Sequence, residues 1–163
     1  MKHDKIVVNA SPIISLAQIG YGDLLLDLSS ELVIPQGVYE EIMNYSPNDS
    51  AVQWVQQRES SVIRSVDVPT VISDWNLGKG ESEVITFAHF NQGFVAALDD
   101  RPAKKCAELF EIKTRGTLAV ILQAKQGGHI PKVHPLLLKL KANGFRISQN
   151  IFNKALALAD EHN

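Results

Sequence analysis

Residues 94–100 read Phe-Val-Ala-Ala-Leu-Asp-Asp, an apolar run that ends abruptly in two carboxylates. An apolar run without alternating polar residues is typical of a strand that is buried on both faces of a parallel sheet. Ligands of open α/β sheets bind at the carboxyl ends of the strands. The pair Asp99 and Asp100 therefore predicts an anionic site at this edge of the sheet, unless one of the two only caps the helix that follows.

Outward from this strand, short β-branched runs alternate with longer helical patterns, which favours an α/β fold with a mostly parallel, twisted sheet flanked by helices. Strands are expected at residues 6–8, 32–34, 62–66, 94–98 and 111–114. Helices are expected at residues 12–19, 23–28, 35–45, 51–57, 81–90, 102–109, 118–125 (N-cap Thr117) and 133–143, and after Ser148. At roughly 150 residues per domain, 163 residues predict one domain over 1–163. We expect its core in residues 1–127 and a helical C-terminal extension in residues 128–163.

Composition narrows the class of protein. With 45% hydrophobic and 21% charged residues, the chain is globular rather than disordered. No apolar run approaches the roughly 18 residues that a membrane span requires. The Met-Lys-His-Asp start lacks the apolar segment of a signal peptide, and the lone Cys106 has no partner for an internal disulfide. We expect a protein of the reducing cytoplasm that does not contact a membrane.

The net charge of −2 conceals a strong asymmetry along the chain. Residues 1–100 hold 5 basic and 14 acidic side chains, whereas residues 101–149 hold 10 basic and 2 acidic ones. This distribution predicts an acidic site beside a basic surface; two solvated faces that happen to differ are the alternative.

Polar residues also follow the first expected strand, Ile6-Val7-Val8. Asn9 and Ser11 come directly after it, so they belong to the same sheet edge as the two aspartates.

Helical spacing indicates which glutamates lie near a buried helix face and which point to solvent. Glu41 borders the apolar stripe of its helix, while Glu40 points to solvent. Glu81 lies three, four and seven residues before apolar positions and is expected in the buried stripe, with Glu83 at its edge. Taken singly, Glu41 reads as a surface residue and Glu81 as a first-turn carboxylate favoured by the helix dipole.

Several carboxylates that meet at strand ends and helix starts form an oxygen-rich cavity, which selects Mg²⁺ or Mn²⁺ over zinc. A water bound to such an ion can attack a phosphodiester. The basic segment would then hold the substrate's phosphates, through the cations nearest the aspartates. These are Arg101, Lys104, Lys105, Lys113, Arg115 and Lys125.

Other chemistries find less support in the residues. The five histidines form no His-Glu-x-x-His pattern, so a zinc site is not expected. There is no glycine-rich phosphate loop that ends in Gly-Lys-Ser/Thr, and no nucleophile elbow.

Four segments in order resemble the motifs of the PIN-domain superfamily. They are residues 6–13, 33–42, 77–85 and 98–101. The closest resemblance is to its prokaryotic branch of small, largely uncharacterised VapC-like proteins. Residues 115–118 and 144–148 also look typical of that branch.

This resemblance implies a Rossmann-like sheet and metal-dependent cleavage of single-stranded RNA. It also implies, for many members, a toxin that pairs with an antitoxin protein and forms a homodimer. Carried over by motif, Glu41, Glu81 and Asp100 are the metal-site acids, and Asp99 is a close rival for the last role. Ser11 matches the small hydroxyl residue that often follows the first motif acid.

One position departs from the pattern. Where PIN nucleases usually carry an aspartate after the first strand, this chain has Asn9, which offers a neutral oxygen and removes one negative charge. Metal affinity and the activation of bound water should both fall.

The leading hypothesis is a ribonuclease in which Glu41, Glu81 and Asp100 hold Mg²⁺ or Mn²⁺. Asn9 and Asp99 support the ion in this hypothesis. Substrate binding is assigned to Ser11, Arg101, Lys104, Lys105 and Arg115. Two alternatives stay open: a degenerate PIN-like module that binds RNA or a protein without cutting, and a phosphatase or regulatory domain that uses the aspartate pair.

Overall fold

A five-stranded parallel sheet organises the computed structural model, which describes residues 3–161. Its strand order is β3-β2-β1-β4-β5, so β1 and β4 lie at the centre. The strands are β1 (Asp4–Val8), β2 (Ser29–Pro35), β3 (Ile63–Arg64), β4 (Phe94–Ala97) and β5 (Thr114–Arg115). Every neighbouring pair is parallel. The predicted α/β class and parallel sheet are confirmed.

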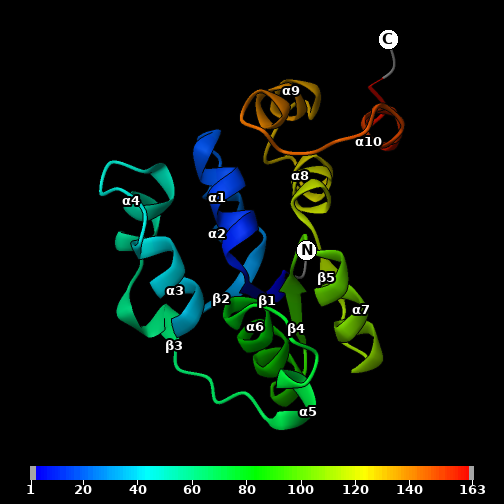
Figure 1. The fold of residues 1–163 in the computed structure, drawn as a ribbon. Helices are drawn as coiled ribbons and strands as arrows, with labels where there is room; N and C mark the ends of the chain where they lie inside the picture. Colours follow the sequence, from blue (N-terminus) through cyan, green and yellow to red (C-terminus); the bar gives the residue numbers. More distant parts are fainter. Residues whose placement is uncertain (1–2, 162–163) are drawn as a thin grey trace.

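Helices cover both faces of this sheet (Figure 1). Their bounds are α1 (Ala10–Gln18), α2 (Leu24–Asp27), α3 (Gln36–Met43), α4 (Ser50–Gln56), α5 (Thr70–Ser73), α6 (Lys79–Phe90), α7 (Arg101–Leu109), α8 (Thr117–Gln126), α9 (His134–Ala142) and α10 (Gln149–Leu158). Figure 1 shows α1, α2 and α8 on one side of the sheet and α6 and α7 on the other, with α9 and α10 beyond α8. No helix within residues 3–161 is both long and apolar enough to span a bilayer.

The two central strands end level with each other. Val8 is in register with Ala97, and the backbone N–H of Asn9 donates to the carbonyl of Ala97 at 3.1 Å. All of β4 and Leu98 are buried, as a strand covered on both faces requires. The residues that follow β1 and β4 therefore emerge side by side at one edge of the sheet.

Some boundaries differ from those expected. Glu111 adopts a left-handed conformation (φ 56°), so the fifth strand begins only at Thr114. Gly116, and not Thr117, is the N-cap residue of α8, and the Thr117 hydroxyl donates to Asp99 instead. A short 3-10 turn at Ser60–Val62 occupies the start of the expected third strand, which is therefore shorter than predicted. The sequence does not predict α5, because its four residues make about one turn and cannot show a helical period.

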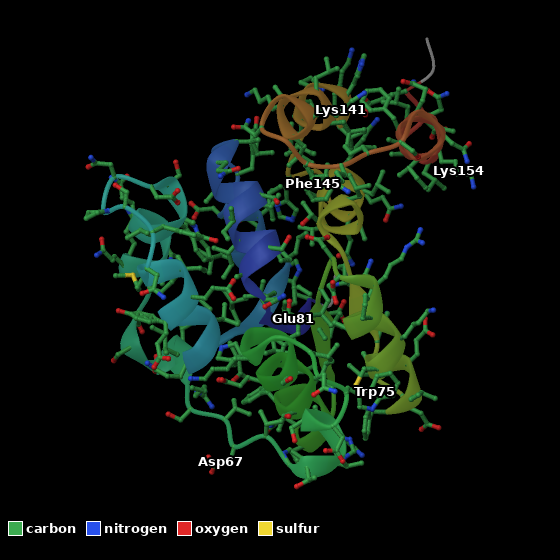
Figure 2. The ribbon with its side chains drawn as sticks, in the orientation of Figure 1. Asp67, Trp75, Glu81, Lys141, Phe145 and Lys154 are labelled. Carbon is green, nitrogen blue, oxygen red and sulfur yellow. The ribbon has the colours of Figure 1, made fainter. Side chains whose placement is uncertain are left out.

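The C-terminal helices join the same hydrophobic cluster as the sheet. The left-handed Gly144 (φ 90°) follows α9, and the Ser148 hydroxyl accepts from Ile151 N at 3.1 Å, which confirms the predicted cap of α10. Figure 2 places Phe145 on the connection between these helices and Lys154 on α10.

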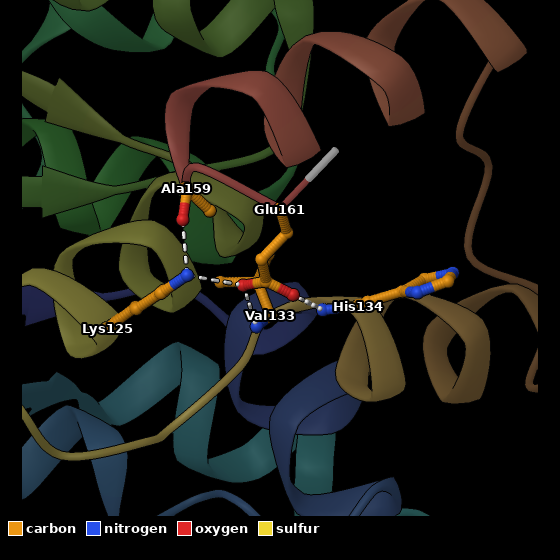
Figure 3. Close-up of polar contacts among 5 residues, drawn as sticks. All are labelled: Lys125, Val133, His134, Ala159 and Glu161. Atoms are coloured by element: carbon orange, nitrogen blue, oxygen red, sulfur yellow. Dashed lines mark hydrogen bonds and ion pairs between the residues drawn. The ribbon is translucent and has the colours of Figure 1, made fainter. Parts of the chain in front are cut away.

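A carboxylate near the C-terminus fastens this extension (Figure 3). Glu161 accepts from the backbone N–H groups of Val133 and His134 at 2.7 and 3.0 Å, at the start of α9. Its third partner is Lys125 of α8 at 2.8 Å, whose ammonium also donates to the carbonyl of Ala159. Burial raises the pKa of Glu161, but these partners outweigh it and lower the pKa below its ordinary value.

Candidate active site

The start of α6 lies against the end of β1, and a glycine permits this approach. A Cβ on Gly80 would be 2.9 Å from Asn9 Oδ1, 3.2 Å from a methyl group of Val38 and 4.0 Å from Glu41 Oε1. Asn9 is only 4% exposed, and its side chain makes no capping hydrogen bond to α1. A carboxamide oxygen and a carboxylate oxygen therefore converge on the first turn of α6.

Glu41 of α3 faces a second carboxylate here. Burial raises the pKa of Glu41, and the negative charge of Glu81 raises it further. Glu81 lies half-buried in the first turn of α6 (Figure 2), where a helix N-terminus favours an anion. Asn9, Glu41 and Glu81 thus share one locality, as the strand-end rule and helical spacing predict.

The neighbouring Glu40 behaves differently. It is exposed and accepts a hydrogen bond from Gln36, which lowers its pKa together with the ammonium of Lys79 at 3.3 Å. The expectation that Glu40 points to solvent is confirmed. Glu41 is exposed as well, but the pKa values of the two glutamates are shifted in opposite directions, which makes Glu40 a natural control for Glu41.

The expected burial of Glu81 and Glu83 is wrong, because the structure reverses their environments. Glu83 is 3% exposed, while Glu81 is only half-buried. Glu83 accepts from the backbone N–H of Gly37 at 2.9 Å, so it satisfies a free donor at the start of α3. A Cβ on Gly37 would overlap Glu83 Oε2. Through this contact, α6 fixes the start of the helix that carries Glu41.

Asp99 is held by three donors from two other segments. The hydroxyl of Ser11 donates to Oδ2 at 2.8 Å, and that of Thr117 donates to the same oxygen at 2.7 Å. The backbone N–H of Thr117 donates to Oδ1 at 2.8 Å. Thr117 is fully buried and was expected only as a cap. Its position just after β5 is the signal that marks it, since it follows a strand end.

Asp100 has different hydrogen-bond partners from Asp99. It is the N-cap residue of α7 and accepts from the backbone N–H of Ala103 at 3.0 Å. Asp100 is exposed, whereas Asp99 is half-buried. The two adjacent aspartates therefore have separate structural roles: one binds Ser11 and Thr117, and the other caps a helix.

The cations expected to bind substrate differ in their exposure to solvent. Lys104 is half-buried; its Nζ and Asp99 Oδ1 lie 3.2 and 3.1 Å from the Cβ position of Gly116. Arg101 and Lys105 lie exposed on α7. Arg115, by contrast, is 9% exposed and pairs with Asp4 at 2.8 Å. Arg115 thus joins β5 to β1, and its side chain is withdrawn from the surface.

The metal-binding donors that Asn9, Glu41 and Glu81 offer at this locality are oxygen atoms. Within residues 3–161, no group of three or more His, Cys, Asp or Glu side chains is arranged to hold a metal. Mg²⁺, however, commonly binds through one or two carboxylates and keeps several waters. After burial, the charge of Glu81 is the second cause of the raised pKa of Glu41, and a bound cation would offset the repulsion between the two carboxylates. With Asn9, they fit a hard divalent ion held by few protein ligands.

Comparison with protein-family models gives a match over nearly the whole chain. Residues 5–161 match the family model DUF3368, which is described as a PIN domain. No curated protein and no solved structure matches the chain significantly.

Proposed function

Because the chain belongs to the PIN-domain family DUF3368, within a nuclease superfamily, we propose that it is a metal-dependent endoribonuclease that cuts single-stranded RNA. The observation that carries this proposal is the approach of Asn9 Oδ1 and Glu41 Oε1 to Gly80, with Glu81 near enough to Glu41 for its charge to raise the pKa of Glu41. These oxygens gather where the central strands end, the location at which α/β sheets bind ligands.

Each residue of the site has a distinct part in the proposal. Glu41 and Glu81 hold Mg²⁺ or Mn²⁺, and Asn9 contributes a neutral oxygen. The ion, when bound, lowers the pKa of water and stabilises charge on the phosphodiester. Asp99 presents a carboxylate whose orientation is fixed by Ser11 and Thr117, so it can accept a hydrogen bond or a proton at a defined position.

Exposed cations of α7 hold the substrate in this proposal. Arg101 and Lys105 are accessible, and Lys104 lies beside Asp99. Lysine and arginine contacts to phosphates supply affinity without reading the sequence. We leave Arg115 out of this surface because its guanidinium pairs with Asp4.

The direct test is cleavage of a fluorescently labelled single-stranded RNA in Mg²⁺ or Mn²⁺. Glu41→Gln should lower the rate by about 10²- to 10³-fold, the usual cost of removing one electrostatic stabiliser. The control is Glu40→Gln, which removes the same charge from the neighbouring position and should leave the rate unchanged. Equal rates for the two variants, or cleavage that persists in a chelator, would overturn the proposal.

A second pair of variants separates the aspartates. Asp99→Asn should abolish cleavage, because it disturbs the carboxylate bound to Ser11 and Thr117. Asp100→Asn should preserve both the rate and α7, since asparagine caps a helix as well as aspartate does. The reverse result would assign the catalytic role to Asp100.

A binding module that does not cut is the second candidate function. Asn9 favours it, because the position after β1 carries no negative charge and no three-carboxylate group is arranged for a metal within residues 3–161. Titration with Mn²⁺ by calorimetry distinguishes the two. Saturable binding to the wild type supports the nuclease, whereas binding only after Asn9→Asp supports the module.

We further propose that the protein is the toxin of a toxin–antitoxin pair and a homodimer. Induced expression should arrest growth, and co-expression of an antitoxin from a neighbouring gene should restore it. Light scattering after size exclusion measures the oligomer. Arrest by the Glu41→Gln variant would argue against RNA cleavage as the cause.

A further inference from the structure

We propose that a groove between α1 and the connection from α9 to α10 binds the backbone of single-stranded RNA beside the candidate active site, with Arg146 as its phosphate contact. This inference rests on the proposed function and adds a substrate subsite to it. It also gives the C-terminal helices a role in substrate binding.

The groove begins at the site itself. It measures about 350 Å³ and is lined from both walls. The lining residues are Ser11, Ile14, Ser15, Gln18, Leu140, Asn143, Gly144, Phe145 and Arg146. Ser11 is shared with the candidate active site, because its hydroxyl donates to Asp99 at 2.8 Å. A strand lying in the groove would therefore pass directly to the carboxylates.

One wall is a polar stripe on α1. Ser11, Ser15 and Gln18 are four and three residues apart, a spacing that places them on the same helix face. The stripe extends for about 10 Å along α1, at 1.5 Å per residue. Hydroxyl and amide groups both donate and accept hydrogen bonds, and they contact phosphates and sugars of nucleic acids.

The charge of the groove favours an anion. Arg146 is its only charged lining residue, and it is exposed. Three other surface cavities each include a carboxylate: Asp4 in one, Asp23 in another and Glu161 in the third. Of the four, only this groove has a cation and no carboxylate in its lining, which is the composition that suits a phosphate backbone.

The second wall is an ordered turn. The left-handed Gly144 donates its N–H to the carbonyl of Lys141 at 3.1 Å, and Phe145 N–H donates to Leu140 at 3.0 Å. The half-buried Phe145 anchors the turn beneath α9 (Figure 2). Arg146 is thus presented from a fixed backbone, which reduces the entropy lost when it binds a phosphate.

The experiment measures binding apart from cleavage. Fluorescein-labelled oligouridine is titrated with protein in EDTA by anisotropy, at several salt concentrations. Arg146→Ala should weaken binding by about 3- to 10-fold and should reduce the slope of log K against log salt by about 0.7, the value for one phosphate of a single strand. Lys154→Ala is the control, because it removes the same charge from α10 outside the groove lining. Thermal unfolding of both variants verifies the fold.

The outcomes separate this inference from the nuclease proposal. Arg146-dependent binding without cleavage in Mn²⁺ would retain the subsite and overturn only the nuclease. Cleavage with identical binding by the Arg146→Ala and Lys154→Ala variants would overturn only the subsite. Absence of any binding by the wild-type protein in EDTA would also overturn the subsite.

Discussion

Gly37 and Glu83 are expected to be thermodynamically coupled, and the coupling has a sign that can be tested. In the wild type, a Cβ on Gly37 would overlap Glu83 Oε2 and lie 2.9 Å from its Cδ. Glu83 is 3% exposed and has little room to withdraw. Gly37→Ala must therefore displace a buried carboxylate from the start of α3.

The magnitudes follow from that contact. Displacement sacrifices the 2.9 Å hydrogen bond from Gly37 N–H, and a bond to a charged group contributes about 1.5–3 kcal/mol. Gly37→Ala should therefore lower the free energy of unfolding by about 1–3 kcal/mol. Glu83→Ala should lower it by about 2–4 kcal/mol, because it removes the bond and leaves a gap.

The sign reverses in the double variant. Once Glu83→Ala has removed the obstructing side chain, Gly37→Ala replaces a helical glycine by alanine at no steric cost. That change should raise the free energy of unfolding by about 0.5–1 kcal/mol. The same substitution is thus destabilising in one background and stabilising in the other, which additive sites do not show.

Urea unfolding followed by circular dichroism at pH 7 measures all four corners of this cycle. Glu108→Ala, which removes an exposed carboxylate of α7, should change the free energy by less than about 0.5 kcal/mol. If Gly37→Ala costs the same with and without Glu83, the contact does not hold α3. In that case α6 does not position Glu41 through the contact between Glu83 and Gly37.

Three further predictions concern the site edge and the C-terminal extension. Gly80→Ala places a Cβ 2.9 Å from Asn9 Oδ1, so Mn²⁺ affinity measured by calorimetry should fall at least about 10-fold; unchanged affinity would remove Gly80 from the site. Thr117→Val keeps the side-chain shape but removes one donor to the carboxylate of Asp99, and urea unfolding should show a loss of about 1–2 kcal/mol. The lowered pKa of Glu161 means that its partners stabilise the fold above the unfolded-state pKa near 4.5, and that this stability is lost as the pH falls through the lower folded-state pKa. The difference in unfolding free energy between wild type and Glu161→Gln should therefore be largest near neutral pH and should shrink in acid; a constant difference would contradict the assigned contacts.

Local patterns predict the elements well here, and the strand-end rule explains why several residues of the candidate site lie at one edge of the sheet. The apolar run before Asp99 and the short run before Asn9 are the two central strands, and both polar residues emerge at the same edge. These features follow from sequence because burial on both faces leaves a continuous apolar signature.

Contacts between distant segments escape that reasoning. Helical periodicity predicts that Glu81 is more buried than Glu83. In the structure Glu83 is the buried one, because it accepts a hydrogen bond from the backbone N–H of Gly37, 46 residues away. The sequence predicts that Thr117 only caps a helix, but in the structure its position after β5 places it in contact with Asp99. In both cases the deciding partner is a backbone donor or a carboxylate that only the tertiary fold supplies.

The central position of β1 has a consequence for folding kinetics. Lys5 pairs with Glu31 of β2 on one side and with Phe94 of β4 on the other, so the second partner of β1 comes almost ninety residues later in the chain. Closing so long a loop is entropically costly and slows folding. The candidate site needs the same event, because Asn9, Glu41 and Glu81 lie within that loop and Asp99 lies just beyond its end. A partly folded chain therefore holds an incomplete site, so the proposed nuclease would gain its activity only after the sheet has closed.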